Sequence, residues 1–349
     1  MSQRSEGHVG WGLVGTGRHA DQYVAPAIQS ATGAYLAAVC GTDTTRTEAF
    51  AHRHGVAAAY TSLERMLDDA SVTHVFVCSP NDLHEEHVRL CAQRGRAVLC
   101  EKPLAHTPES AARMVEVCRS HGIPLGVGYH LRHNRAHVRA REAIAAGAVG
   151  EVLSVEVQYV HRTGTAPAAP LPAWRRDPGR VGGGQFAGTG THAADLAGWL
   201  VADTLASVYA TQYRHATDDG GEHIVQTVVG RLAGGVLVSL SAGRMPHALN
   251  AVTVTGTKGV VRLTGSVGNR GGGRMEILRP DSTTTVEVVE HDVYREQIEA
   301  FERAVRLGYR PSADGVDGLN GVNVAVAVER SLQNGAEVVV GELATAGKE

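Results

Sequence analysis

The sequence has no long apolar run and no large excess of charge of either sign. No stretch approaches the about eighteen apolar residues that a membrane-spanning helix needs, and the N-terminal MSQRSEGHVGWGLVG lacks the basic head and apolar stretch of a signal peptide. A net charge of −3 and a pI near 6.7 provide no uniform positive field for nucleic acid or an anionic membrane. We therefore expect a cytoplasmic protein that binds neither.

The sequence also lacks the short motifs of several enzyme classes. It has no HExxH helix of a zinc protease, no GxSxG turn of a serine hydrolase and no GxxxxGK[ST] phosphate loop. His130, His133 and His137 recur at helical intervals. Because zinc needs three or four converging ligands, a solvated helix face explains these histidines better than a metal site. We predict no metal site.

Cysteine pairs of the CxxC type are absent as well. The five cysteines form an odd set, and three of them stand inside apolar, strand-like runs, so we expect small buried apolar side chains. They are Cys40, Cys78, Cys91, Cys100 and Cys118.

The length and the pattern of the first third predict a parallel sheet. A chain of 349 residues exceeds what one hydrophobic core usually organises, so we expect two domains with a ligand site at their junction. Short apolar runs alternate with helix-patterned segments, as crossover helices require. The expected strands cover 9–14, 34–40, 73–79, 97–101 and 124–129. This predicts an α/β fold with a doubly wound, parallel Rossmann sheet over residues 1–128.

After about residue 150 the apolar and polar residues alternate along strand-like runs. Turns such as LAGGV and TGTKG separate these runs, which indicates a large, mostly antiparallel open sheet. Helices are expected near 193–200, 294–307 and 316–334. The pattern predicts an α+β domain over residues 129–349 for substrate binding and oligomerisation, with the helix near 316–334 a candidate to pack back on the first domain.

A glycine-rich turn follows the first expected strand directly and opens a helix. Glycines in a GxGxxG/A pattern permit a tight turn and close backbone approach to a pyrophosphate, and the helix N-terminus offers unpaired N–H groups. The turn therefore predicts a dinucleotide site formed by Gly15, Thr16, Gly17, Arg18 and His19.

The end of the second strand bears on the choice between NAD and NADP. An acidic residue there would accept a hydrogen bond from the ribose 2′-hydroxyl and repel a 2′-phosphate. The strand instead runs into Gly41 and Thr42, Asp43 stands one residue further along the chain, and Arg46 opens the next helix. Thr42 and Arg46 could hold a 2′-phosphate, so the sequence favours NADP over NAD.

Further strings in the chain resemble the Gfo/Idh/MocA oxidoreductases, relatives of glucose–fructose oxidoreductase and inositol dehydrogenase. The segment from Ser79 and Pro80 through Asn81 to His84 resembles the TPNxxH motif of that family, and Glu101-Lys102-Pro103 is similar to its EKP motif. Gly128 to Arg132 resembles GYxxR, and Gly182 to Asp195 resembles GGGxxxDxGxHxxD. These strings keep the order of the family and extend the resemblance over nearly the whole chain.

The resemblance implies an NAD(P)-dependent enzyme that transfers a hydride between nicotinamide and a carbinol or keto carbon of a sugar, sugar derivative or cyclitol. It places Ser79, Pro80, Asn81, His84 and Glu101 at the cofactor. It also puts Lys102 beside the nicotinamide, implies a cis bond between Lys102 and Pro103, and implies a homodimer or homotetramer built through the C-terminal sheet.

The chemistry assigns roles to two of these residues independently. Alcohol oxidation needs a base for the hydroxyl proton, and an imidazole can cycle around neutral pH, so His192 is the candidate base. The ammonium group of Lys102 would stabilise a developing alkoxide and relay the proton. Candidate substrate contacts are Lys102, Tyr129, His130, Arg132, Trp174, Arg175, Thr191 and His192.

One departure from the family concerns the residue four positions before His192. The family usually has an acid there that orients the imidazole, whereas this chain has Gly188. Asp195 lies three residues after His192, on the same helix face, and is a third candidate catalytic residue. The alternative is that Asp195 only holds the helix to the sheet.

Two other functions fit the same sequence. One is an NAD-dependent glycosidase of the same fold, in which transient oxidation permits elimination of a leaving group. The other is a non-catalytic regulator that binds NAD(P) and contacts a protein partner. Loss of the acid at Gly188 favours the regulator, whereas retention of Lys102 and His192 argues against it.

Overall fold

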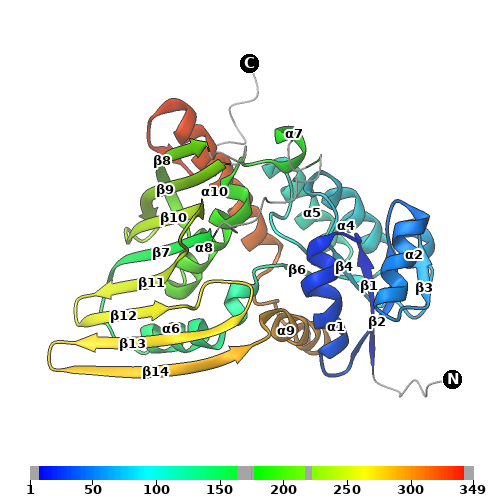
Figure 1. Ribbon diagram of the computed structural model, residues 1–349, viewed down its shortest axis with the longest axis horizontal. Helices are drawn as coiled ribbons and strands as arrows, with labels where there is room; N and C mark the ends of the chain where they lie inside the picture. The colour runs from blue at the N-terminus through cyan, green and yellow to red at the C-terminus, as the bar shows by residue number, and fades with distance from the viewer. Residues whose placement is uncertain (1–7, 163–173, 175–176, 217–221, 342–349) are drawn as a thin grey trace. The chain divides into compact units, whose positions relative to one another are not determined.

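The computed structural model describes residues 8–162, 174, 177–216 and 222–341, which form two compact units (Figure 1). The first unit comprises the described residues up to Gly128 together with Tyr294–Leu319, and the second comprises those of Tyr129–Val293 and of Asn320 onwards. Among the described residues, no helix combines the length and apolar character that crossing a bilayer requires.

The first unit is built on a six-stranded, fully parallel sheet in the order β3-β2-β1-β4-β5-β6. The order reverses between β1 and β4, so the carboxyl ends of these two strands flank the crevice where such folds bind ligands. The elements are β1 Val9–Val14, η1 Ala20–Val24, α1 Ala25–Ser30, β2 Ala34–Cys40, α2 Thr44–Arg53, β3 Ala58–Tyr60, α3 Leu63–Leu67, β4 His74–Val77, η2 Asn81–Leu83, α4 His84–Gln93, β5 Ala97–Cys100, α5 Pro108–Ser120 and β6 Leu125–Val127.

From Tyr294 onwards, helix α9 (Val293–Leu307) also belongs to the first unit. The ring of Phe301 lies 5.9 Å from the ring of Trp11 on β1, and the Trp11 indole donates to Glu302 at 2.7 Å. Gly12, the next residue on β1, faces α3 on the other side of the sheet. The expected domain division put α9 in the second domain, because the spacing of its apolar residues does not reveal which sheet it covers.

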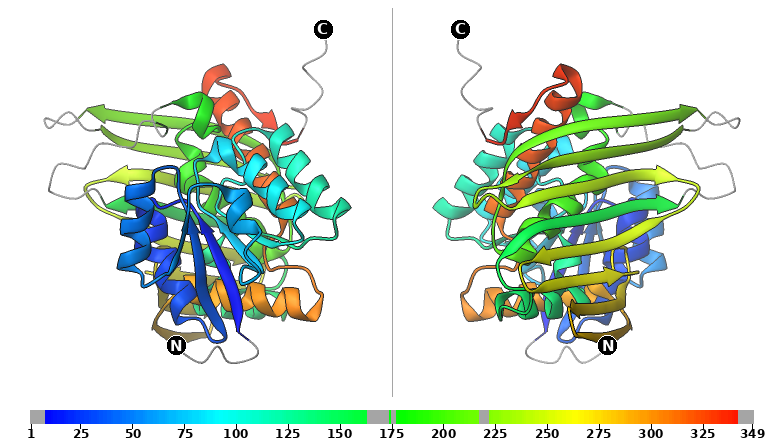
Figure 2. Two further views of the ribbon diagram at one scale, coloured as in Figure 1. Left: turned by 90° about the vertical axis from the view of Figure 1, so that its right-hand side faces the viewer. Right: turned by 90° about the vertical axis from the view of Figure 1, so that its left-hand side faces the viewer.

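The second unit is built on a nine-stranded sheet in the order β14-β13-β12-β11-β7-β10-β9-β8-β15, antiparallel except between β7 and β10. Figure 2 shows its strands on one side and the helices behind them. The elements are η3 His130–His133, α6 Arg135–Ala145, β7 Val152–Arg162, α7 Pro178–Val181, α8 Phe186–Val201, β8 Leu205–Ala216, β9 Glu222–Leu232, β10 Leu237–Met245, β11 Leu249–Gly256, β12 Gly259–Thr264, β13 Gly271–Arg279, β14 Ser282–His291 and β15 Val338–Val339.

Helices α6 and α8 cover the buried face of this sheet, and α10 (Gly315–Asn334) adds Val324 and Val328 to the same core. The first residues of α10 belong to the first unit, where Gly318 packs against Leu104 and Val127. The predicted fold class, a parallel Rossmann sheet plus a mostly antiparallel sheet, is confirmed. The strands β3, β13 and β15 and the π-helical turn η1 were not predicted from the sequence.

Two histidines lie inside these cores in the neutral form. Burial lowers the pKa of His74, which packs beside Trp11 and Phe301, to about 4. Burial likewise lowers the pKa of His137 to about 4, although a hydrogen bond to the Leu131 carbonyl opposes the shift. Protonation of either ring is therefore easier in the unfolded chain, whose histidines titrate near 6.5.

We therefore expect the free energy of unfolding to fall as the pH drops from about 6.5 to 4. In that window the unfolded chain binds protons that the folded chain does not, at a cost of up to about 3 kcal/mol for each histidine. Chemical denaturation at several pH values measures the slope, which His74→Gln should reduce. His52→Gln, at an exposed position on α2, is the matched control. An unchanged slope in His74→Gln would contradict this account.

Candidate active site

The glycine-rich turn after β1 lies against the end of β4. Gly15 has φ +101°, and a Cβ there would stand 2.6 Å from the Cys78 carbonyl oxygen, so both its conformation and its surroundings require glycine. A Cβ at Gly17 would meet no described heavy atom within 4 Å. The chain then enters η1, where the Asp21 N–H donates to the Gly17 carbonyl at 3.0 Å. This geometry can admit a pyrophosphate.

The loop after β2 has a positively charged side chain beside a hydroxyl group. Asp43 is the N-cap of α2 and accepts a hydrogen bond from the Arg46 backbone N–H at 2.8 Å. The Arg46 guanidinium donates to Thr42 Oγ1 at 3.1 Å. Since the Asp43 carboxylate caps a helix, Thr42 and Arg46 are groups suited to a 2′-phosphate.

His84 connects two of the loops at this sheet edge. It is fully buried, with Nε2 2.9 Å from the Ser79 carbonyl oxygen and Nδ1 3.0 Å from the Leu104 carbonyl oxygen. Burial lowers the pKa of His84, and the two carbonyls oppose that shift. A neutral imidazole has one N–H and donates to one carbonyl at a time. Through its contact with the Ser79 carbonyl, His84 therefore supports the loop that contains Ser79, Pro80 and Asn81.

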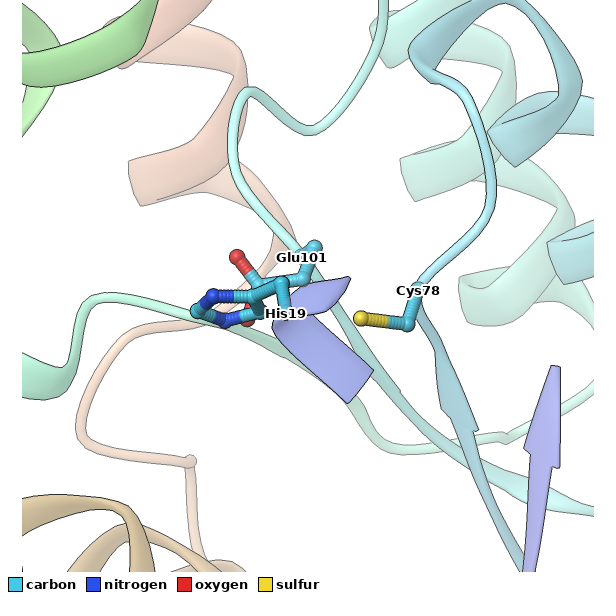
Figure 3. Close-up of side chains that lie close together, drawn as sticks. All are labelled: His19, Cys78 and Glu101. Carbon is cyan, nitrogen blue, oxygen red and sulfur yellow. The ribbon is translucent and has the colours of Figure 1, made fainter. Parts of the chain in front are cut away.

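The turn after β5 holds Lys102. Its bond to Pro103 is cis, as the resemblance implied. Glu101 anchors the turn, since Oε2 accepts from the Lys102 N–H at 3.2 Å and Oε1 lies 3.0 Å from His19 Nε2. Figure 3 shows the His19 ring beside the Glu101 carboxylate, with the sulfur of Cys78 directed toward both. Sequence reasoning missed Cys78 as a member of this site, although it directly precedes the Ser79-Pro80-Asn81 motif.

Helix α8 of the second unit carries His192. The helix is preceded by Gly182, Gly183 and Gly184, which all have φ between 56° and 67°. A Cβ at Gly183 would stand 2.6 Å from Ala325 on α10, and a side chain at Gly184 would collide with Glu329. The glycine run is therefore required for a left-handed turn that packs closely against α10.

Aromatic rings surround the buried His192 imidazole. Its ring centroid lies 4.6 Å from that of His130, 5.8 Å from that of Tyr129 and 6.0 Å from that of Tyr159, and 4% of the residue is exposed. His130 is held by the Gly268 carbonyl at 3.1 Å. Sequence reasoning missed Tyr159 because it lies within the regular alternation of β7, where nothing marks it as a neighbour of α8.

Asp195 forms a buried ion pair with Arg132. The guanidinium donates through Nε to Oδ2 at 2.9 Å and through Nη2 to Oδ1 at 2.5 Å, and the two side chains are 7% and 4% exposed. Paired donors of this kind fix a carboxylate in position as well as compensate its charge. Asp195 thus ties α8 to the turn η3.

The remaining predicted residues differ in their surroundings. Thr191 is buried and its hydroxyl donates to the Ala187 carbonyl of its own helix at 3.1 Å. Arg18 is exposed and donates to Gln22 at 3.1 Å. Trp174 is partly buried, whereas Arg175 lies outside the described residues. Gly188 is exposed, and a Cβ there would meet no heavy atom of the described residues within 4 Å.

The interpretation of His130 and His137 as members of a solvated helix face is wrong. Both are buried, and His137 contacts the Leu131 carbonyl at 2.8 Å and Ser266 Oγ at 3.0 Å. These contacts make His137 a structural residue.

Each unit therefore assembles one part of the predicted site. The first unit brings together the turn of Gly15 to His19 and the turn of Glu101 and Lys102, and the second gathers Tyr129, His130, Arg132 and Asp195 near His192. The convergence of Lys102 and His192 at one bound substrate stays a prediction.

Comparisons with known proteins match both units. Residues 9–129 match the family described as "Oxidoreductase family, NAD-binding Rossmann fold", and residues 137–262 match the "GFO/IDH/MocA C-terminal domain". The chain is 30% identical to the 1,5-anhydro-D-fructose reductase of Ensifer adhaerens over 95% of this chain and 99% of that protein. It is 29% identical to the D-xylose 1-dehydrogenase (NADP(+)) 2 of Haloferax volcanii over 94% of this chain and 98% of that protein.

A solved structure has the same fold. Levoglucosan dehydrogenase in complex with NADH and L-sorbose superposes with a TM-score of 0.82 at 21% identity, covering 95% of this chain and 99% of that chain. Both family matches support one family assignment, as do the relatives that match over nearly their whole length. The shared fold agrees with it. The chain belongs to the GFO/IDH/MocA family of oxidoreductases, whose N-terminal domain is an NAD-binding Rossmann fold.

Proposed function

We propose that this protein is an NAD(P)-dependent dehydrogenase or reductase that acts on a carbinol or keto carbon of a sugar, sugar derivative or cyclitol. The observation that carries the proposal is the Glu101-Lys102-Pro103 turn, which presents a lysine at the carboxyl edge of the parallel sheet and is anchored by the Glu101 carboxylate. Relatives of full length are named as a reductase and a dehydrogenase of such compounds.

The residues of the chain divide the chemistry between them. The bound nicotinamide would accept or deliver the hydride. His192 would take the hydroxyl proton during oxidation and return it during reduction, and the aromatic rings around it restrict its orientation and exclude water. Lys102 would place its ammonium group beside the same substrate oxygen and stabilise the charge that develops there.

Asp195 and Arg132 are proposed to act on His192 through the position of α8. Their two hydrogen bonds fix the helix against η3, which also carries His130. The loss of an acid at Gly188 removes one way of orienting the imidazole, and the rings of Tyr129, His130 and Tyr159 provide another. Trp174, Arg175 and Thr191 stay proposed substrate contacts.

For the cofactor we propose a preference for NADP. The Arg46 guanidinium beside Thr42 supports it, because the pair offers a positive charge and a hydroxyl group where a 2′-phosphate would lie. The dinucleotide itself would lie on the turn of Gly15 to His19, with Gly41, Ser79, Pro80 and Asn81 along its sides.

We also propose that the enzyme is cytoplasmic and forms a homodimer or homotetramer through the sheet of the second unit. Apolar side chains on the outer face of that sheet support the assembly. Tyr209 on β8 pairs in register with Val229 on β9, and both are more than 40% exposed. Burial of such a face in a second copy would remove apolar surface from water.

The first test is turnover. Incubation of sugars and inositols with NADP or NAD, or of keto sugars with NADPH or NADH, should change the absorbance of the reduced cofactor. Lys102→Ala and His192→Ala should each lower kcat by roughly a hundredfold or more, the effect of removing an acid-base group. His133→Ala, at a partly exposed position on η3, is the control.

Other outcomes of this test would select another function. Wild-type rates in either variant would remove that residue from the mechanism. Tight cofactor binding without turnover of any substrate would favour the NAD(P)-binding regulator. Cleavage of a p-nitrophenyl glycoside with no net change in the cofactor would favour the glycosidase.

The second test concerns the cofactor preference. Arg46→Ala should raise the KM for NADP at least about tenfold, because a charge-assisted hydrogen bond to phosphate contributes roughly 1.5–3 kcal/mol. The KM for NAD should stay within about twofold. Arg53→Ala on the same helix, whose side chain contacts Asp21, is the matched control. An equal change for both cofactors would contradict a 2′-phosphate contact.

The third test concerns the buried ion pair. Arg132→Met leaves the Asp195 carboxylate buried without its guanidinium and should lower the free energy of unfolding by about 3–5 kcal/mol. The double variant Arg132→Met/Asp195→Leu should recover much of that loss. Arg270→Met breaks an exposed pair with Glu290 and should cost about 1 kcal/mol or less. If chemical denaturation gave equal costs for Arg132→Met and Arg270→Met, the pair would not hold α8 in place.

A further inference from the structure

Three side chains with different ligand atoms converge at the carboxyl edge of the parallel sheet. His19 comes from the turn after β1, Cys78 from the end of β4 and Glu101 from the end of β5. The imidazole nitrogen, the thiol sulfur and a carboxylate oxygen all lie within 4.8 Å of one another. In Figure 3 the Glu101 carboxylate lies beside the His19 ring, and the Cys78 sulfur points toward this pair.

The distances suit a zinc ion after small side-chain rotations. Zinc bonds of about 2.0–2.3 Å to nitrogen, oxygen and sulfur place neighbouring ligand atoms of a tetrahedron about 3.3–3.7 Å apart. His19 Nε2 and Glu101 Oε1 are 3.0 Å apart, so they need to separate slightly while the sulfur approaches. A set of one nitrogen, one sulfur and one oxygen favours zinc over magnesium, which prefers oxygen ligands alone.

Neighbouring groups already orient these ligands. The His19 ring lies 5.3 Å from that of Tyr23 and 5.5 Å from that of Tyr294, so two aromatic contacts restrict its plane. Glu101 is oriented by the Lys102 N–H. Groups that hold ligands in place raise the affinity of a metal site. Three protein ligands would leave a fourth position for water.

We propose that His19, Cys78 and Glu101 bind a zinc ion, and that bound zinc excludes the dinucleotide. His19 belongs to the glycine-rich turn and Cys78 borders it, so the ion would occupy the crevice between β1 and β4 where the strand order reverses. Only the exclusion rests on the proposed dinucleotide site, because the metal ligands are defined without it. Zinc would then act as an inhibitor of cofactor loading.

Metal binding is measured on the whole protein after chelator treatment and removal of nucleotide. Calorimetric titration with Zn²⁺ should show one equivalent, and titration with Co²⁺ should produce a thiolate-to-metal charge-transfer band. Cys78→Ser should abolish the band and weaken zinc binding at least tenfold, and His19→Gln should weaken it to a similar degree. Cys118→Ala and His52→Gln, which alter a cysteine and a histidine elsewhere in the first unit, should bind as the original chain does.

The exclusion is measured by the fluorescence of bound NADPH or NADH. Its apparent Kd should rise in proportion to the zinc concentration in the original chain and stay constant in folded Cys78→Ser. Absence of zinc binding, or zinc binding by Cys78→Ser and His19→Gln as tight as that of the original chain, would overturn the site. Simultaneous binding of zinc and dinucleotide at unchanged affinities would overturn the exclusion. Dinucleotide binding without zinc tests the proposed cofactor site separately.

Discussion

The close backbone approach between Gly15 and Cys78 is the constraint on which the rest of the site depends. The end of β1 and the end of β4 meet where the strand order reverses, and only a residue without Cβ fits beside the Cys78 carbonyl. This approach places the glycine-rich turn next to the loop that contains Ser79. His84 then connects that loop to Leu104, and Glu101 connects the neighbouring turn to His19. Three loops of the first unit are thus fixed by a few short contacts, and Lys102 stands among them.

The second unit holds His192 by other means. Rings on three sides and a buried ion pair between Arg132 and Asp195 set the position of α8. Separating a buried carboxylate from its guanidinium partner is costly, so the ion pair restricts the position of α8. By the family resemblance an acid usually stands four positions before this histidine, whereas this chain has Gly188 there and three aromatic rings beside the imidazole. This packing is consistent with a role for His192 in the chemistry of this NAD(P)-dependent oxidoreductase.

Much of this arrangement could be predicted from the sequence, because its determinants are local. The turn at Gly15 and the alternation in β7 to β12 each depend on neighbouring residues. The sheet to which α9 belongs could not be predicted, because amphipathic spacing does not name the surface that a helix covers. The cluster of His19, Cys78 and Glu101 was missed for a related reason, since its members are separated in sequence and meet only through the sheet order. The burial of His137 depends equally on the distant Ser266.

The central claim is that the Lys102 ammonium group and the His192 imidazole meet at one substrate oxygen. The most direct measurement is a crystal structure of the protein with a bound dinucleotide and a sugar or cyclitol substrate. The account predicts Lys102 Nζ and a ring nitrogen of His192 within about 3.2 Å of the same hydroxyl or keto oxygen, the distance that proton transfer requires. A bound substrate whose reacting oxygen contacts neither group would contradict the account.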